Sequence, residues 1–176
     1  MVILLGIVLG NSACNGSAFK EVEEMQPWPQ ASQQPASILP PNLNDLGLGD
    51  AIILDARISE SIWSEGTYDH GAVAEYTVDS ETAVWIAALR YDESDDAGDE
   101  YAGMVSWAEE NCGWHGWIRI GGAGIINCGW SDAFNKTLMN DIWIVDIIAQ
   151  DTVPTPPDEF VNRVRDAIAE HWDTLD

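Results

Sequence analysis

Asp55 and Asp146 are the residues of this chain that could carry acid–base chemistry, because each lies in the middle of an apolar run. Paired carboxylates, with His115 close by, could transfer protons in a small hydrolase. The structural alternative is that each carboxylate pairs with an arginine, such as Arg57 or Arg90, or points to solvent at a sheet edge. We favour the structural role and predict no catalytic residue.

A second set of residues could bind a ligand. His115, Trp117 and Arg119 alternate along one predicted strand, so they share a face of a hairpin, which Trp130 joins from the next strand. The opposite face is more apolar and is expected to face the core. Tryptophans beside an arginine suit a sugar ring or an aromatic partner, if the face is exposed. Alternatively, the C-terminal helix packs on this face and buries it.

Cys112 and Cys128 remain as a pair once the N-terminal cysteine is set aside. In an exported protein such a pair predicts a disulfide. A two-residue turn at Gly122–Ala123 would place Cys128 opposite Trp117, with Cys112 roughly 16 Å further along at strand rise. A disulfide needs Cα atoms within about 7 Å. Either the chain doubles back before the strand, or the turn is looser, or no bond forms.

Other common sites fail on spacing. The acidic run 92–100 has Ala97 where an EF-hand loop needs glycine, so solvated acids at a helix start are favoured over a calcium site. The three histidines are far apart and no CxxC is present, which argues against zinc. The glycines at 121–124 lack the dinucleotide-binding spacing, and the chain contains no P-loop. We therefore predict no metal and no cofactor.

The strands and helices that would position the candidate residues are predicted from the periodicity of apolar residues. Residues 131–140 are interpreted as a polar connection. The order βββαβββα predicts an α+β domain with an antiparallel sheet of about five to six strands and two helices. The predicted strands are 51–58, 72–78, 82–91, 114–120, 125–130 and 142–149, and the predicted helices are 94–111 and 158–175. Residues 79–81 are predicted to form a short turn between the second and third strands. Apolar residues at helical spacing predict one buried stripe on each helix: Ala97, Tyr101, Met104, Val105, Ala108 and Cys112 on the first, and Phe160, Val161, Val164, Ile168, Trp172 and Leu175 on the second.

The charge balance narrows the choice of partners. Thirty acidic residues face seven basic ones, for a net charge of −23, and only two residues are lysine. Such a chain repels nucleic acid and anionic membrane surfaces. The dense acidic composition and the scarcity of lysine resemble halophilic archaeal proteins, in which acidic surfaces stay hydrated in brine. The alternative is an acidic protein from an ordinary source.

The N-terminus predicts export. Residues 2–9 form an apolar run that is too short for a transmembrane helix but fits a signal peptide, and small residues follow it up to Cys14. This arrangement resembles a lipoprotein signal, in which Cys14 would be lipidated, although Asn11 stands where leucine is usual and no basic residue precedes the run. The alternative is a short buried strand. The proline-rich residues 15–45 predict a tether.

Together these features predict three segments: a signal at 1–14, a tether at 15–45 and a single domain at 46–176. The pattern resembles haloarchaeal-type secreted lipoproteins that carry a small α+β domain. The resemblance covers the pattern of elements only and transfers no functional residue. We predict a non-enzymatic binding or interaction domain of a halophilic microbe, anchored at the cell surface by lipid alone, with a carbohydrate or protein as its partner. The alternatives are a small extracellular hydrolase that uses Asp55, Asp146 and His115, or a structural subunit of a surface assembly.

Overall fold

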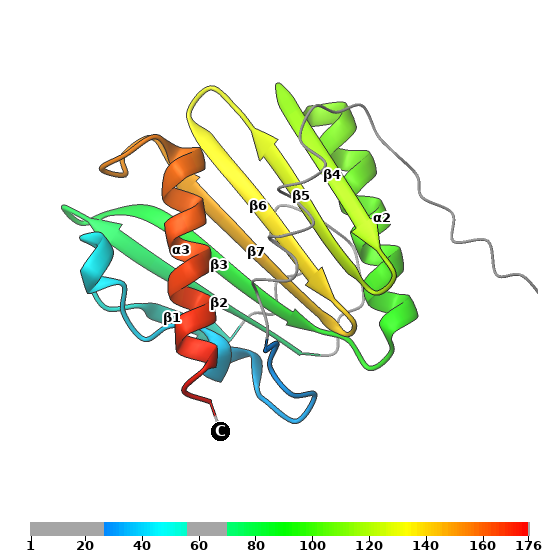
Figure 1. The fold of residues 1–176 in the computed structure, drawn as a ribbon. Coiled ribbons are helices and arrows are strands. Elements are labelled where there is room, and N and C mark those ends of the chain that lie inside the picture. The colour runs from blue at the N-terminus through cyan, green and yellow to red at the C-terminus, as the bar shows by residue number, and fades with distance from the viewer. Residues whose placement is uncertain (1–26, 56–69, 176) are drawn as a thin grey trace, which may run out of the picture.

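The computed structural model describes residues 27–55 and 70–175. Within them the chain forms a seven-stranded antiparallel sheet, in the order β1-β2-β3-β7-β6-β5-β4, with two α-helices packed on it (Figure 1). The fold is therefore α+β, as predicted. The elements are η1 Pro35–Ile38, η2 Asn44–Leu46, β1 Ile52–Asp55, β2 His70–Val78, β3 Glu81–Arg90, α2 Ser94–Asn111, β4 Trp114–Ile120, β5 Ala123–Gly129, β6 Ala133–Asn140, β7 Trp143–Gln150 and α3 Pro157–Trp172.

Two antiparallel meanders meet in the middle of the sheet. Strands β1 to β3 form the first, and α2 then carries the chain to the opposite edge, where β4 begins the second. The second meander ends when β7 pairs with β3. The predicted turn between β2 and β3 is tight, since Asp79 and Ser80 have φ angles of 50° and 69°. Two consecutive positive φ angles are what a type I′ hairpin turn requires.

The two helices lie on opposite faces of the sheet, so the domain has two hydrophobic cores (Figure 1). Both helices bury the stripes that their sequences predict. The apolar buried residues of α3 are Phe160, Val161, Val164, Ile168 and Trp172. The buried residues of α2 include Ala97, Tyr101, Met104 and Ala108. Helical periodicity therefore identified the inward faces of both helices correctly.

The number and order of strands differ from the prediction, because the polar connection expected at 131–140 contains β6. The observed order is βββαββββα. β6 resembles a loop in sequence because three consecutive polar residues, Asn135, Lys136 and Thr137, occupy its centre. All three are buried between β5 and β7. Apolar alternation cannot reveal a strand whose buried positions are polar and satisfied by their neighbours.

The predicted tether is wrong over its described part, since residues 27–50 pack against the sheet. Ile38, Leu39, Leu43 and Leu48 are buried in the larger core. The backbone of this segment also accepts hydrogen bonds from the body of the domain. Donors to it are Tyr76 Oη at 2.6 Å from Pro40 O, Trp172 Nε1 at 2.9 Å from Ile38 O, and Arg90 Nη1 at 3.1 Å from Gln33 O. The folded domain therefore begins before residue 46.

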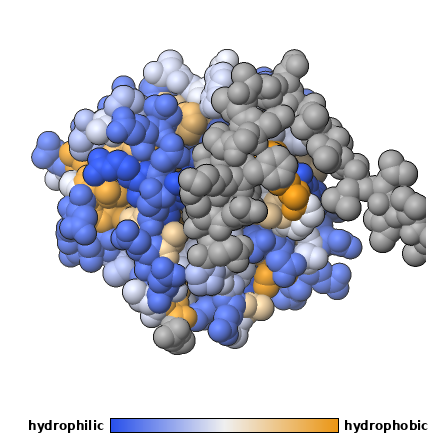
Figure 2. Space-filling view, in the orientation of Figure 1, coloured by the Kyte–Doolittle hydropathy of each residue, from blue (hydrophilic) through white to orange (hydrophobic). Residues whose placement is uncertain are grey.

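The described surface is predominantly hydrophilic in the orientation of Figure 2. Among the acidic side chains whose burial is described, only Asp146 is buried, Glu75 and Glu100 are partly buried, and the others are exposed. Lys136, the one lysine in this part of the chain, is buried. The described part of the surface is therefore strongly acidic, with Arg119 and Arg163 as exposed basic side chains.

Candidate functional site

The predicted binding face exists, but α2 covers most of it. His115, Trp117 and Arg119 share the face of β4 that also carries Cys128 of β5. This face belongs to the smaller core, which α2 closes. The alternative considered from the sequence was that the C-terminal helix would cover this face, but that helix, α3, packs on the opposite face of the sheet. Both faces of the hairpin therefore contribute to a core.

The two tryptophans of this face are structural. Trp117 and Trp130 pack against the smaller core. The indole Nε1 of Trp117 donates a hydrogen bond to Glu109 Oε1 of α2 at 3.0 Å. The ring of Trp130 meets that of Trp107, also on α2, edge to face with centroids 5.8 Å apart. These contacts hold the helix on the hairpin, so the flat, exposed tryptophan surface that would favour a binder here is not formed.

Glycines let α2 approach the hairpin closely. A Cβ atom on Gly124 of β5 would lie 2.6 Å from the ring of Tyr101 on α2, and a Cβ on Gly98 of α2 would lie 2.5 Å from the Arg119 guanidinium. Arg119 Nη1 donates to Gly98 O at 3.2 Å. The guanidinium carbon also lies 6.0 Å from the Tyr101 ring centroid, within cation–π range. Arg119 is thus engaged by the helix, while His115 remains exposed.

Tyr101 anchors the middle of the interface between α2 and the hairpin. Its phenolic oxygen lies 2.7 Å from Ile118 O and 2.8 Å from Ile125 O, and its single proton can be donated to one of these carbonyls. Burial raises the pKa of this phenol well above its usual range, and the nearby Arg119 opposes that shift only in part. The phenol is therefore neutral at physiological pH and acts as a hydrogen-bond donor.

The structure contains the Cys112–Cys128 disulfide, with the two Cα atoms 5.6 Å apart. The predicted register of the hairpin is wrong by two positions. Its turn lies at Gly121–Gly122, so Cys128 pairs with His115 and not with Trp117. Cys112 is the C-cap of α2 and lies above the sheet instead of extending the strand, which removes the geometric objection. The bond joins the C-terminal end of α2 to the end of β5, the strand next to the sheet edge.

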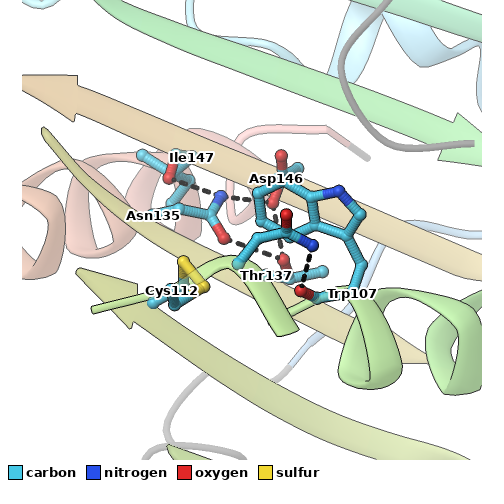
Figure 3. Close-up of a disulfide and its surroundings, with 8 residues drawn as sticks. Trp107, Cys112, Asn135, Thr137, Asp146 and Ile147 are labelled. Atoms are coloured by element: carbon cyan, nitrogen blue, oxygen red, sulfur yellow. Dashed lines mark hydrogen bonds between the residues drawn. A yellow bond between two sulfur atoms is a disulfide. The ribbon is translucent and has the colours of Figure 1, made fainter. Parts of the chain in front are cut away.

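Asp146 belongs to a buried polar cluster near this disulfide (Figure 3). Asn135 Nδ2 and Thr137 Oγ1, both on β6, each donate to Asp146 Oδ1 at 2.6 Å. Asn135 Nδ2 also donates to Ile147 O at 3.2 Å. Asn135 is paired with Cys128 of β5 in the sheet, which places the cluster next to the disulfide. Hydrogen bonds to a carboxylate are stronger than those between neutral groups. The cluster thus fixes β6 against β7.

The arrangement does not assemble the acid–base set considered from the sequence. His115 is on β4 and Asp146 on β7, which are three strand spacings apart, or about 14 Å. Asp55 is the last residue of β1 and pairs with Ala72 on β2. β1 is three strand spacings from β7, on the side of β7 opposite to β4. Proton transfer requires heavy atoms within about 3 Å of each other or of a shared water. These residues therefore form no common site.

The sheet edge at β1 carries a surface that the sequence did not identify as a site. Ile52, Ile53 and Leu54 are 55%, 39% and 49% exposed, and they lie next to one another on both faces of the strand. In the described part of the chain β1 pairs with β2 alone and ends the sheet. The run AIILDARI predicts a strand, but no local signal indicates that it lies at an edge.

Residues 27–55 and 70–175 hold neither a metal centre nor a membrane-spanning helix. No group of three or more histidine, cysteine, aspartate or glutamate side chains is placed to hold a metal ion there. No helix in the same residues is long and apolar enough to cross a membrane. Cys14 and the predicted signal lie outside the described residues.

No protein-family model matches the chain, and no curated protein does. Among solved structures, the chain is similar to the crystal structure of a GTP-binding regulator from Thermotoga maritima. The match has a TM-score of 0.50 and 12% sequence identity, and covers 81% of this chain and 92% of that one. At this level of identity the likeness shows a shared fold and carries no functional residue across.

Proposed function

We propose that the chain is a non-enzymatic interaction domain that is exported by a halophilic microbe. It binds a partner protein through β1, where a strand of the partner pairs with β1 and extends the sheet. The exposed apolar edge of β1 is the observation that carries this proposal. Natural proteins protect sheet edges with lysines, prolines, bulges or covering segments, because an open edge pairs with other chains. β1 instead presents Ile52, Ile53 and Leu54 to solvent.

The charge around β1 indicates the chemistry of its partner. Asp50 precedes the strand and is exposed, and Glu75 lies opposite Ile52 on β2. A second copy of this chain would bring two surfaces of the same sign together, with a net charge of −23 on each. An extended segment with alternating apolar residues and flanking lysines or arginines complements the edge in both respects.

A synthetic peptide of alternating isoleucine and threonine, with lysines at both ends, is expected to bind the domain. The substitution Ile53→Lys should raise the Kd of the peptide about tenfold or more, because a charge placed at the centre of the β1 edge blocks apolar pairing with the peptide. Binding should be measured by fluorescence anisotropy at the lowest salt concentration at which circular dichroism shows a folded domain. The same peptide with glutamates in place of lysines should bind more weakly.

Ala102→Lys is the matched control, since it adds the same charge at an exposed position of α2, far from β1 in the sheet order. It should leave the Kd unchanged. Equal losses in the two variants would mean that net charge, and not the edge, governs binding. An unchanged Kd in Ile53→Lys would rule out β1 as the docking edge.

Export and lipid anchoring at Cys14 complete the proposal. The apolar run before this cysteine supports it, as does the Cys112–Cys128 bond, because disulfides persist in oxidising compartments. Cys14→Ser in the full chain should move the protein from the membrane fraction to the soluble fraction of its host cell. Detergent extraction followed by phase partitioning gives the measurement, and a variant that still enters the detergent phase would contradict a lipid at Cys14.

Two other functions have less support. A hydrolase would need a shared site for Asp146 and His115, whose strands lie about 14 Å apart. GTP binding, which the structural neighbour's description mentions, would need a phosphate-binding loop. The glycine-rich segment of this chain forms the β4–β5 hairpin turn at Gly121–Gly122 and leads into a strand, not into the N-terminus of a helix.

A further inference from the structure

Trp114 lies at the opposite edge of the sheet from β1 and is the most exposed of the large hydrophobic side chains in the described residues. Its exposed fraction is 57%. It belongs to β4, on the face away from α2, and it is not part of either core. An indole this exposed contributes little to burial in either core.

The ring of Trp114 is held in place rather than projecting freely. It stacks on Phe134 of β6, with ring centroids 5.9 Å apart and an angle of 26° between the planes. Phe134 is itself packed against the larger core. Gly129 of β5 lies between them in the same row of the sheet, and a Cβ there would meet both rings at 3.6–3.7 Å. The two rings therefore form an aromatic surface across three strands, which we call the Trp114–Phe134 shelf.

The surroundings of the shelf offer small and polar groups. In the next row of the same face, Gly116 on β4 and Asn127 on β5 are half-buried, and Lys136 on β6 is buried. A Cβ on Gly116 would meet no atom within 4 Å, so open space borders the shelf. Asp132 is exposed in the loop that precedes Phe134. An amide and a carboxylate beside an aromatic surface can form hydrogen bonds with hydroxyl groups.

We propose that the Trp114–Phe134 shelf binds a sugar ring of a neutral glycan. The apolar C–H face of a pyranose would stack on the indole, and its hydroxyl groups would hydrogen-bond to Asn127 and Asp132. The charge of the surface selects the class of sugar. Asp132 is exposed whereas Lys136 is buried, so the shelf meets a ligand with a negative surface, and the net charge of −23 likewise opposes uronic acids and sulfated sugars. An uncharged ring with hydroxyl groups at its rim suits a flat aromatic surface whose border is polar.

The shelf is independent of the proposed strand-addition edge, because β4 and β1 end the sheet on opposite sides. Loss of either interaction therefore leaves the other testable. A Trp114 variant should not alter peptide binding, and an Ile53 variant should not alter glycan binding.

The test uses the full chain and a panel of glucose, galactose and mannose hexasaccharides, with an oligogalacturonate as the anionic comparison. Binding is followed through the indole N–H resonance of Trp114 in a ¹H–¹⁵N spectrum, which is assigned by its absence in Trp114→Phe. At least one neutral hexasaccharide should shift this resonance. The variants lack this resonance, so for them and for the parent the Kd is taken from the backbone amide shifts of Asn127 and Gly129 in the same spectrum. Trp114→Ala should raise the Kd of that sugar about tenfold or more, whereas Trp114→Phe, which retains an aromatic ring, should stay within about threefold.

Thermal melts of both variants provide the fold control. Their Tm should stay close to that of the parent, because the exposed Trp114 side chain contributes little to the core. The proposal is overturned if no neutral sugar moves the resonance, if Trp114→Ala binds as the parent does, or if the oligogalacturonate binds as well as the neutral sugars. A resonance that responds to the lysine-flanked peptide and to no sugar would reassign the shelf to a protein partner.

Discussion

Transfer from about 2 M to about 0.1 M potassium chloride is expected to lower the Tm of this protein by about 10 °C. The reason is self-repulsion among the exposed acids that give the chain its net charge of −23. Repulsion is screened within about 3 Å at 1 M salt but reaches about 10 Å at 0.1 M. A loss of about 3 kcal/mol corresponds to about 6–12 °C for a domain of this size. Circular dichroism melts across the salt range give the measurement.

A variant with fewer surface acids separates charge from the general effect of salt on apolar burial. Asp99→Asn, Glu110→Gln and Glu170→Gln replace three exposed acids and change the net charge from −23 to −20. Its Tm should depend less steeply on salt than that of the parent. A Tm that does not respond to salt, or an equal slope in the two proteins, would contradict a halophilic adaptation of this surface.

Removal of the Cys112–Cys128 disulfide is expected to destabilise the domain by about 3 kcal/mol, or about 6–12 °C in Tm. The two cysteines are 16 residues apart, and closing a loop of that length restricts the unfolded chain by about this amount. The bond also fixes the C-terminal end of α2, whose middle is held by Tyr101. The double variant Cys112→Ala, Cys128→Ala should be compared with the oxidised parent in denaturant titrations.

Hydrogen exchange gives the local readout for the same variant. Loss of the bond should increase exchange in the last turn of α2 and at the start of β4, with little change in α3 on the other face of the sheet. Reduced parent protein should behave as the double variant does. If oxidised and reduced proteins unfold at the same denaturant concentration, the bond contributes nothing to stability.

Helical and strand periodicity predicted a large part of the fold. Helix 94–111 has the bounds that its sequence predicts, and α3 buries the predicted stripe. Strand alternation likewise assigned His115, Trp117 and Arg119 to one face of β4. These predictions hold because the period of a helix or strand is fixed by local backbone geometry, so neighbouring residues alone decide which side chains share a face.

Predictions that depended on distant partners were less reliable. β6 was missed because its central residues Asn135 and Thr137 are polar, and their burial is compensated by hydrogen bonds to Asp146 on another strand. The described part of the predicted tether, from residue 27, packs against β2, β3 and α3, because carbonyl groups there accept hydrogen bonds from Tyr76, Arg90 and Trp172. Polar and proline-rich segments carry no periodic signal, so their burial depends on contacts that are remote in sequence.

The sequence by itself determined the paired cysteines, the acidic character of the chain and the division of the β4–β5 hairpin into two faces. Only the tertiary structure decided which faces are covered. α2 crosses to the far edge of the sheet and closes over Trp117 and Trp130. Within residues 27–55 and 70–175, Trp114 and the three apolar residues of β1 are the large hydrophobic side chains that stay exposed. The physical reason is that alternation fixes which residues point together, whereas the path of a crossover helix is set by packing between elements far apart in the chain.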